Sequence, residues 1–199
     1  MQSRAVVGRL TIAAIVAVAP YARAQSAPAG PIAVLQSGTL SFSAHATVGD
    51  FVGSTTTIMG AVTGDLPDAR GWVEAPVATL VTHNEHRDRD LRSSMEVEKY
   101  PSMRFTLARA SSVSPSSGAA AATLHGALTI HGVTREVDLP ATIERSADTI
   151  HVTSVFPVDL HDYRIGGLTK MLGLLRMDSH IEVHVDLRFI ATSPSIPEP

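Results

Sequence analysis

The stretch from Leu124 to Ile143, LHGALTIHGVTREVDLPATI, alternates apolar and polar residues in two runs that His131 and Gly132 separate. In the first run, the apolar side holds Leu124, Gly126, Leu128 and Ile130. In the second run, the apolar side holds Val133, Val137, Leu139, Ala141 and Ile143, with Arg135 interrupting the row. A period of two predicts half-buried antiparallel strands, and the glycine supplies the positive φ of a tight turn. We therefore expect a sheet with one apolar face.

The same alternation recurs before and after these two strands. It predicts further strands near residues 33–45, 51–63, 72–82, 103–110, 149–160 and 181–189. Pro76 predicts an edge or a bulge in the third strand, and the segment 111–122 is expected to be a flexible hairpin loop. Because the spacing of βαβ units is lacking, the fold class is all-β. We predict an eight-stranded antiparallel barrel, since closure removes exposed edges and leaves room for side chains or one slender ligand.

Two segments break the period and are expected to be short helical inserts. Residues 84–99 are mostly polar, Ser93 and Glu96 fit a capping box, and Pro101 stops any helix before it. Residues 165–177 are apolar and rich in glycine. Two interpretations of this second insert stay open: ordinary core packing, or a mobile lid at a portal of the barrel.

The first 24 residues have the pattern of a secretory signal peptide. A positive start is followed by a short apolar run and by Ala22-Arg23-Ala24, which predicts cleavage after Ala24. The apolar run is shorter than the ~20 residues that cross a bilayer. We therefore expect an exported, periplasmic protein with a linker at 25–32, one domain at 33–190 and a disordered tail at 191–199.

Charge and cysteine content narrow the possible partners and chemistry of this exported chain. Removal of residues 1–24 leaves 13 basic and 19 acidic residues, a net charge of −6. Such an acidic chain disfavours nucleic acid as a partner. The absence of cysteine excludes disulfides, zinc thiolates and thiol catalysis.

The polar residues give no clear signature of catalysis or of a metal site. His83 and His86 could share the face of a turn, whereas His180 and His184 would lie about 13 Å apart along a strand. No metal site is therefore expected. No G-x-S-x-G motif is present, and Ser, His and Asp are too frequent for their co-occurrence to indicate hydrolysis. The run Arg87-Asp88-Arg89-Asp90 fits a solvated turn or a structural plug that ties the helical insert to the barrel rim.

Several motifs, in order along the chain, resemble the YceI family. They are Phe42-x-x-His45, Arg87-Asp88, Arg89-Asp90-Leu91-Arg92-Ser93, Val97-Glu98-Lys99-Tyr100-Pro101 with Phe105, Leu128 to Val137, and the strand after Asp178. The likeness runs from about Leu40 to Phe189. It departs from the family at Ser94-Met95-Glu96, where many members have an aromatic pair, and in the longer insert at 165–177.

The resemblance implies a lipocalin-like barrel that binds a long isoprenoid chain, such as a quinone tail or a polyprenol. The expected interior is apolar and places no candidate nucleophile opposite a candidate base, so a binding or carrier protein is expected rather than an enzyme. Such a carrier requires no cofactor, has an isoprenoid lipid as partner, and is compatible with transient membrane contact and a homodimer. The alternative is a structural or stress-response module whose interior its own side chains fill. An esterase-like or haem-handling enzyme finds no supporting motif.

The expected ligand-binding residues come from the apolar sides of the strands and from the second insert. Trp72 and the segment 165–177 are expected near the mouth of the barrel. The full set is Phe42, Trp72, Leu128, Ile130, Phe156, Leu168, Met171, Leu172 and Phe189.

Overall fold

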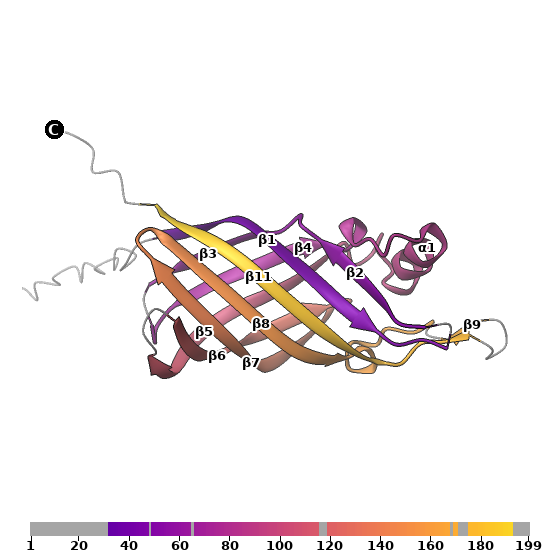
Figure 1. Ribbon diagram of the computed structural model, residues 1–199. Helices are drawn as coiled ribbons and strands as arrows, with labels where there is room; N and C mark the ends of the chain where they lie inside the picture. Colours follow the sequence, from indigo (N-terminus) through magenta and orange to yellow (C-terminus); the bar gives the residue numbers. More distant parts are fainter. Residues whose placement is uncertain are drawn as a thin grey trace, which may run out of the picture.

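The computed structural model describes residues 32–47, 49–64, 66–115, 119–167, 169–170 and 175–192. Most of them form a closed antiparallel barrel (Figure 1). The strands are β1 (Ile32–Ala44), β2 (Phe51–Thr55), β3 (Met59–Thr63), β4 (Arg70–Pro76), β5 (Ser102–Pro115), β6 (Ala119–Ile130), β7 (Val133–Ser146), β8 (Thr149–Asp159), β9 (Thr169–Lys170), β10 (Leu175–Arg176) and β11 (His180–Thr192). The predicted signal peptide lies outside the described residues, as do 25–31 and 193–199.

The barrel closes because the first and last strands pair with each other. Around the wall the order is β1-β3-β4-β5-β6-β7-β8-β11, and β11 returns to β1. Their register runs from Ile32 opposite Thr192 to Ser43 opposite Glu182. β2 pairs with the far end of β1, so β2 and β3 occupy one position and the barrel has eight strands. The predicted fold class and strand number are confirmed.

The hairpin of β6 and β7 forms as its sequence predicts. Leu124 faces Leu139, Leu128 faces Arg135, and Ile130 faces Val133 across the pair. Both turn residues, His131 and Gly132, have positive φ, at 51° and 70°. This is the geometry of a two-residue hairpin turn whose twist matches that of the flanking strands.

Four local expectations are corrected. The predicted strand 51–63 is interrupted between Thr55 and Met59, where β2 ends and β3 begins. The strand expected at 72–82 ends at Pro76 and is followed by a short 3-10 turn, Val77–Thr79. The expected loop 111–122 is strand on both sides, because β5 runs to Pro115 and β6 begins at Ala119. In the insert 165–177, the described residues include the two-stranded pair β9–β10 and no helix.

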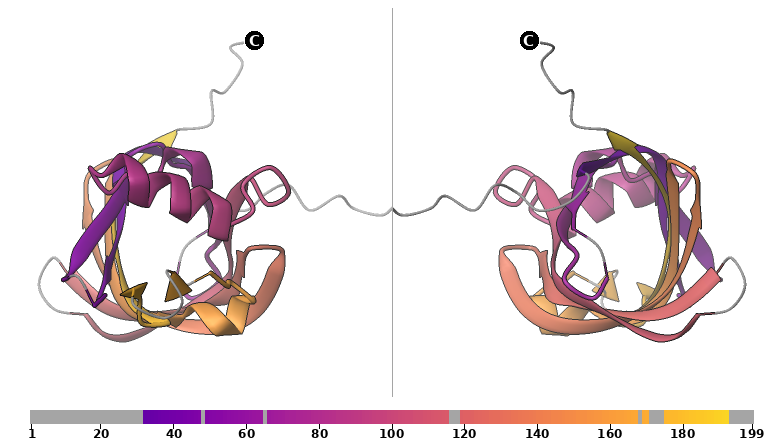
Figure 2. Two further views of the ribbon diagram at one scale, coloured as in Figure 1. Left: turned by 90° about the vertical axis from the view of Figure 1, so that its right-hand side faces the viewer. Right: turned by 90° about the vertical axis from the view of Figure 1, so that its left-hand side faces the viewer.

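The first helical insert is α1 (Glu85–Ser94), and its start differs from the predicted one. The side chain of Asn84 accepts hydrogen bonds from the backbone N–H groups of His86 and Arg87 at 3.0 and 3.1 Å. Ser93 lies in the last turn of α1, so the expected capping box does not cap it. A second short 3-10 turn, Leu160–Tyr163, follows β8. Figure 2 shows α1 lying across one end of the barrel.

The core follows the inward faces of the strands. One cluster lies toward α1 and includes Phe42, Leu128, Ile130 and Phe156, each 8 % exposed. A second cluster lies toward the opposite end and includes Ala33, Leu187 and Phe189. No helix of the described residues has the length and hydropathy needed to cross a membrane.

Candidate functional site

The interior of the barrel is hollow. Two cavities, of about 480 and 440 Å³, follow each other along the barrel. Leu40, Met103, Leu128 and Phe156 line both of them. These four residues, which we call the waist, therefore mark where the two cavities meet.

The larger cavity occupies the end of the barrel away from α1. Its wall is formed mainly by aliphatic and aromatic side chains from successive strands, among them Phe105, Leu124, Leu139, Val152, Leu187 and Phe189. Its outer limit is set by the β3–β4 connection, through Gly64, Leu66 and Ala69, and by the start of β6. Such a wall offers burial to an apolar chain and almost no hydrogen bonds.

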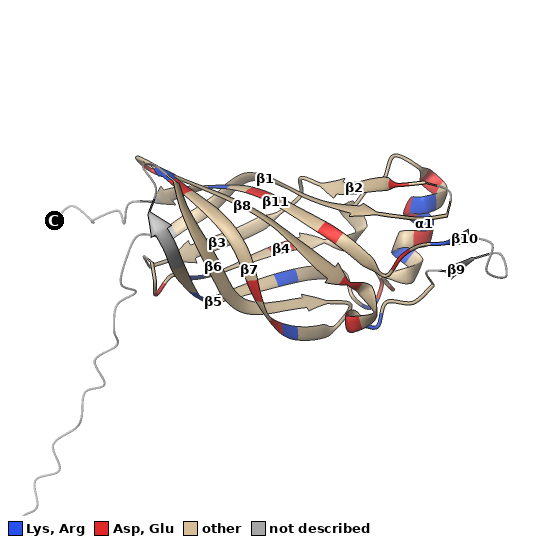
Figure 3. Cartoon of the chain, turned by 60° about the horizontal axis from the view of Figure 1, so that its bottom comes forward, with Lys and Arg blue, Asp and Glu red and all other residues tan. Residues whose placement is uncertain are grey.

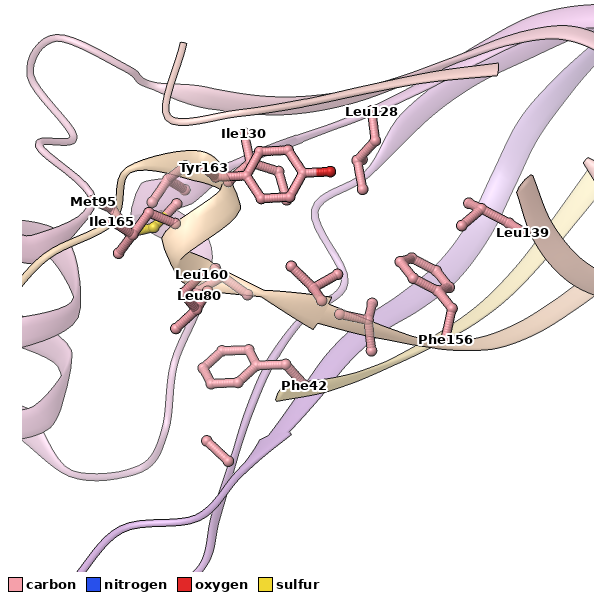
Figure 4. Close-up of a cluster of buried hydrophobic side chains, with 14 residues drawn as sticks. Phe42, Leu80, Met95, Leu128, Ile130, Leu139, Phe156, Leu160, Tyr163 and Ile165 are labelled. Carbon is pink, nitrogen blue, oxygen red and sulfur yellow. The ribbon is translucent and has the colours of Figure 1, made fainter. Parts of the chain in front are cut away.

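The smaller cavity lies between the waist and α1, and Figure 4 draws the buried hydrophobic cluster that supplies several of its wall residues. Phe42, Leu80, Met95 and Ile130 point into this region. The ring of Phe51 packs edge-on against Phe42, with centroids 6.1 Å apart. This end is therefore a second apolar chamber.

The polar part of the smaller cavity is concentrated at its rim. Asn84, His86, Arg87, Asp90 and Arg176 belong to its lining. The Arg87 guanidinium lies 4.1 Å from the centroid of the Phe51 ring, which holds that side chain against the barrel. Figure 3 marks both acidic and basic positions on α1, whereas most positions along the strands are of neither kind.

Asp88 fixes α1 on the barrel. Its carboxylate accepts hydrogen bonds from the backbone N–H and the hydroxyl of Thr82, at 2.8 and 2.6 Å. Asp88 and Thr82 are both buried, and the hydrogen bond from the Thr82 hydroxyl lowers the pKa of the carboxyl. Of the two interpretations of the Arg87–Asp90 run, the plug at the rim therefore fits the structure.

The β6–β7 turn is held from two sides, by the segment after α1 and by the 3-10 turn after β8. The ring of His131 packs 4.5 Å from the Tyr100 ring, and its Nδ1 lies 3.1 Å from the carbonyl oxygen of Tyr163. Its Nε2 lies 3.4 Å from a Glu96 carboxylate oxygen. Burial raises the pKa of the Tyr163 hydroxyl. The contacts join the turn to the segment after α1, so this end of the barrel is a connected assembly.

Six of the predicted ligand-binding residues belong to the cavity walls, and one of them, Trp72, is described separately below. Leu128 and Phe156 belong to the waist, Phe42 and Ile130 to the smaller cavity, and Phe189 to the larger one. Leu168, Met171 and Leu172 fall on residues whose side chains lie outside the described part of the structure. The role of all of these residues in binding stays a prediction.

Trp72 belongs to the wall of the larger cavity, but its ring packs on the outer side of that wall. Val73 and Ala75 face the core, so their neighbours Trp72 and Glu74 alternate to the outside. Arg104 lies 4.5 Å from the centroid of the Trp72 ring and forms an ion pair with Glu74 at 2.8 Å.

The expectation that Trp72 and the segment 165–177 share one mouth is wrong. Ile165, Gly167, Arg176 and Met177 line the smaller cavity, and Trp72 borders the larger one.

The prediction missed two waist residues, Leu40 and Met103. Leu40 lies on the apolar side of β1, with Phe42, and Met103 begins the inward row of β5. Alternation alone could have placed both on the inner face. It could not show that they meet Leu128 and Phe156, because they come from four different strands.

The possible metal ligands among the described residues are dispersed. Within the described ranges, no group of three or more His, Asp or Glu side chains is arranged to hold a metal ion.

A closed antiparallel barrel with an elongated apolar cavity defines the class of lipocalin-like binding barrels. Residues 34–189 match the family model described as "YceI-like domain", and the chain belongs to the YceI-like family. No curated protein matched the chain.

Solved structures show the same fold at low sequence identity. A polyisoprenoid binding domain from Saccharophagus degradans, implicated in plant cell wall breakdown, is 17 % identical with a TM-score of 0.64, covering 82 % of this chain and 99 % of that one. BcnA from Burkholderia cenocepacia is 14 % identical with a TM-score of 0.63, covering 76 % and 95 %. The YceI protein of Campylobacter jejuni is 20 % identical with a TM-score of 0.58, covering 71 % and 84 %.

Proposed function

We propose that this protein is a periplasmic carrier that holds a long isoprenoid chain, such as a quinone tail or a polyprenol, inside its barrel. The observation that carries the proposal is the pair of apolar cavities, about 480 and 440 Å³, which meet at the waist. An extended chain that fills both must pass Leu128 and Phe156. The hollow interior does not fit the alternative of a barrel filled by its own side chains.

Two further observations support the ligand class and the location. The barrel from Saccharophagus degradans is described as a polyisoprenoid binding domain, and its fold covers most of this chain. The first 24 residues have the pattern of a cleaved export signal. The proposed function requires no cofactor, since the lipid is the cargo that the barrel carries.

The energetics suit exchange with a membrane. Burying each CH₂ group away from water gains about 0.8 kcal/mol, so an isoprenoid chain is strongly driven out of solution. A bilayer offers the same apolar surroundings as the cavity, so transfer between the two is close to neutral. A carrier of this kind loads and releases by transient contact with membranes.

The test is to express the full chain in a Gram-negative host, purify it from the periplasm and extract it with organic solvent. Mass spectrometry should find an isoprenoid lipid at close to one molecule per barrel. The matched control is the same chain with Leu128→Trp, which narrows the waist. Extracts of the wild-type protein that contain no isoprenoid, even after incubation with isoprenoid-containing vesicles, would overturn the proposal.

A further inference from the structure

Three polar residues on neighbouring strands form a hydrogen-bonded row on the outer face of the barrel. The hydroxyl oxygen of Ser111 on β5 lies 2.9 Å from Nε2 of His125 on β6. Nδ1 of His125 lies 2.6 Å from a carboxylate oxygen of Asp138 on β7. We propose that Ser111, His125 and Asp138 form a nucleophilic site that cleaves small activated esters, separate from the lipid cavity.

The outer position of Ser111 depends on a β-bulge. Met103 and Leu107 line the inner cavities, so odd-numbered residues of β5 point inward up to that point. The register against β6 shifts between Leu107 and Arg109, and Ala110 then points inward, only 2 % exposed. The bulge therefore turns Arg109 and Ser111 to the outside, as bulges next to active sites re-aim side chains.

The register then fixes the order of the row. His125 stands directly opposite Asp138 on β7 and opposite Arg109 on β5, and Ser111 is the diagonal neighbour. The side chain of His125 is 19 % exposed and that of Asp138 is 69 % exposed. The imidazole of His125, the proposed base, is therefore mostly covered by its neighbours, whereas the carboxylate of Asp138 is exposed to solvent.

The hydrogen bonds assign the protons. An ionised carboxylate only accepts hydrogen bonds, so Nδ1 of His125 donates to Asp138. In neutral imidazole the other nitrogen is then an acceptor, so the Ser111 hydroxyl donates to Nε2. The serine hydroxyl donates its proton to the base, and the carboxylate orients that base. This arrangement activates a serine nucleophile, and it is recognised by its geometry on unrelated folds.

The reaction follows from these positions. The Ser111 oxygen attacks the acyl carbon while its proton passes to Nε2 of His125. The tetrahedral intermediate breaks its bond to the alkoxy oxygen, which leaves with the proton from Nε2. Water, deprotonated by the same nitrogen, then releases the acid and restores Ser111. Arg109, exposed and on the same face, supplies positive charge near the developing oxyanion.

The site is open to water, so charge stabilisation is weaker than in a dry pocket and turnover is slow. A covalent readout is therefore more direct than turnover. An alkyl fluorophosphonate should form a bond between its phosphorus and the Ser111 oxygen with loss of fluoride. We would incubate the full chain with this reagent and locate the adduct by peptide mass spectrometry.

The expected result is one adduct on Ser111, lost in Ser111→Ala. His125→Gln should slow labelling about 100-fold, in line with general-base catalysis, and Asp138→Asn about tenfold. Ser43→Ala is the matched control, since Ser43 is a serine on the outer side of β1, opposite Glu182. It should leave labelling unchanged. Hydrolysis of p-nitrophenyl acetate should fall in the same order.

If the row forms a reactive site, the thermal midpoint should change little in all three variants, whereas a role in structure alone would change the midpoint. Lipid retention should not change, because the row lies outside the barrel. Absence of an adduct on Ser111 would overturn the proposal. So would His125→Gln protein that is labelled at the wild-type rate, because Ser111 would then react without its base.

Discussion

Asp88 accepts two hydrogen bonds from a single residue, Thr82, and both residues are buried. Thr82 follows the segment that leaves β4, and Asp88 lies in the first turns of α1. The pair therefore fastens the helix to the barrel end at which the smaller cavity opens. Through these hydrogen bonds, the polar run from Arg87 to Asp90 has a structural role, because it supports the end of the barrel that holds the smaller cavity.

Asp88→Ala should destabilise the protein by about 1.5–3 kcal/mol at pH 7, the range for hydrogen bonds to a charged group. Urea denaturation measures the loss. Thr82→Val removes only the hydroxyl donor and should cost less. Equal stability of Asp88→Ala and wild type at pH 7 would contradict the anchoring role.

The effect of Asp88→Ala should also depend on pH. The folded-state pKa of Asp88 lies below its ordinary value of 3.8, mainly because of the Thr82 hydroxyl. A lowered pKa contributes stability above the unfolded-state pKa, and the contribution is lost as pH falls through the folded-state pKa. The gap between wild type and variant should therefore stay constant from about pH 7 to pH 5 and narrow below about pH 4.

Leu128→Trp should abolish retention of a long isoprenoid, because the added ring fills the waist. Overpacking costs about 1–3 kcal/mol where no void exists, and here the cavities leave room, so the thermal midpoint should fall little. Thr106→Trp, on the exposed outer side of β5, is the control. Loss of lipid in both variants, or a large drop in midpoint for Leu128→Trp alone, would argue against a continuous passage.

Val137→Asp should unfold the domain or destabilise it by at least about 3 kcal/mol, since it places a charge against the core. Val137 is half-buried and packs on the cluster around Phe42 and Leu128. Thr142→Asp on the exposed side of the same strand should be nearly neutral. Circular dichroism with urea compares them, and a stable Val137→Asp protein would show that this position tolerates charge.

Gly126→Ala should destabilise the barrel by about 1–3 kcal/mol. A methyl group there would lie 2.2 Å from the Thr106 carbonyl oxygen and 2.9 Å from the Phe105 ring. Gly166→Ala is the matched control, because no atom lies within 4 Å of its added carbon. Thermal midpoints of the two variants should differ clearly, and equal midpoints would refute the close approach.

Export should yield a mature protein that begins at Gln25. Ala22 and Ala24 are the small residues that signal peptidase requires before the cut. Intact-mass measurement of the periplasmic protein is the check, with an Ala24→Arg variant as control for the cleavage site. Exported, membrane-retained protein that keeps Met1 would rule out the predicted cleavage.

The sequence predicted the parts of this fold whose periodicity is strong. The β6–β7 hairpin has alternation on both strands and a His-Gly turn, so its register was predictable. The outer part of the β5–β6 hairpin was not predictable, because a run of Ser and Ala has no apolar–polar alternation. Its backbone nevertheless continues the strand pairing of β5 with β6. The cap of α1 was missed because Ser93 and Glu96 imitate a helix start, whereas Asn84 supplies the real one.

The same limit applies to the sites. Inward residues such as Phe42 and Leu128 follow from the period of their own strands. The waist and the row of Ser111, His125 and Asp138 depend on register between strands, and in β5 on a bulge that reverses the facing of Ser111. A local pattern contains no information about such a shift.

The pairing of β1 with β11 also bears on how the domain folds. The wall closes only when the last strand reaches the first, so these contacts have the greatest sequence separation in the domain. High contact order is typical of barrels that fold in milliseconds to seconds rather than microseconds. In an exported chain that crosses the membrane N-terminus first, the closing strand emerges last. Under the proposed export, the polypeptide would remain unfolded enough to be threaded during translocation, and the cavity would form only after the closing strand has crossed the membrane.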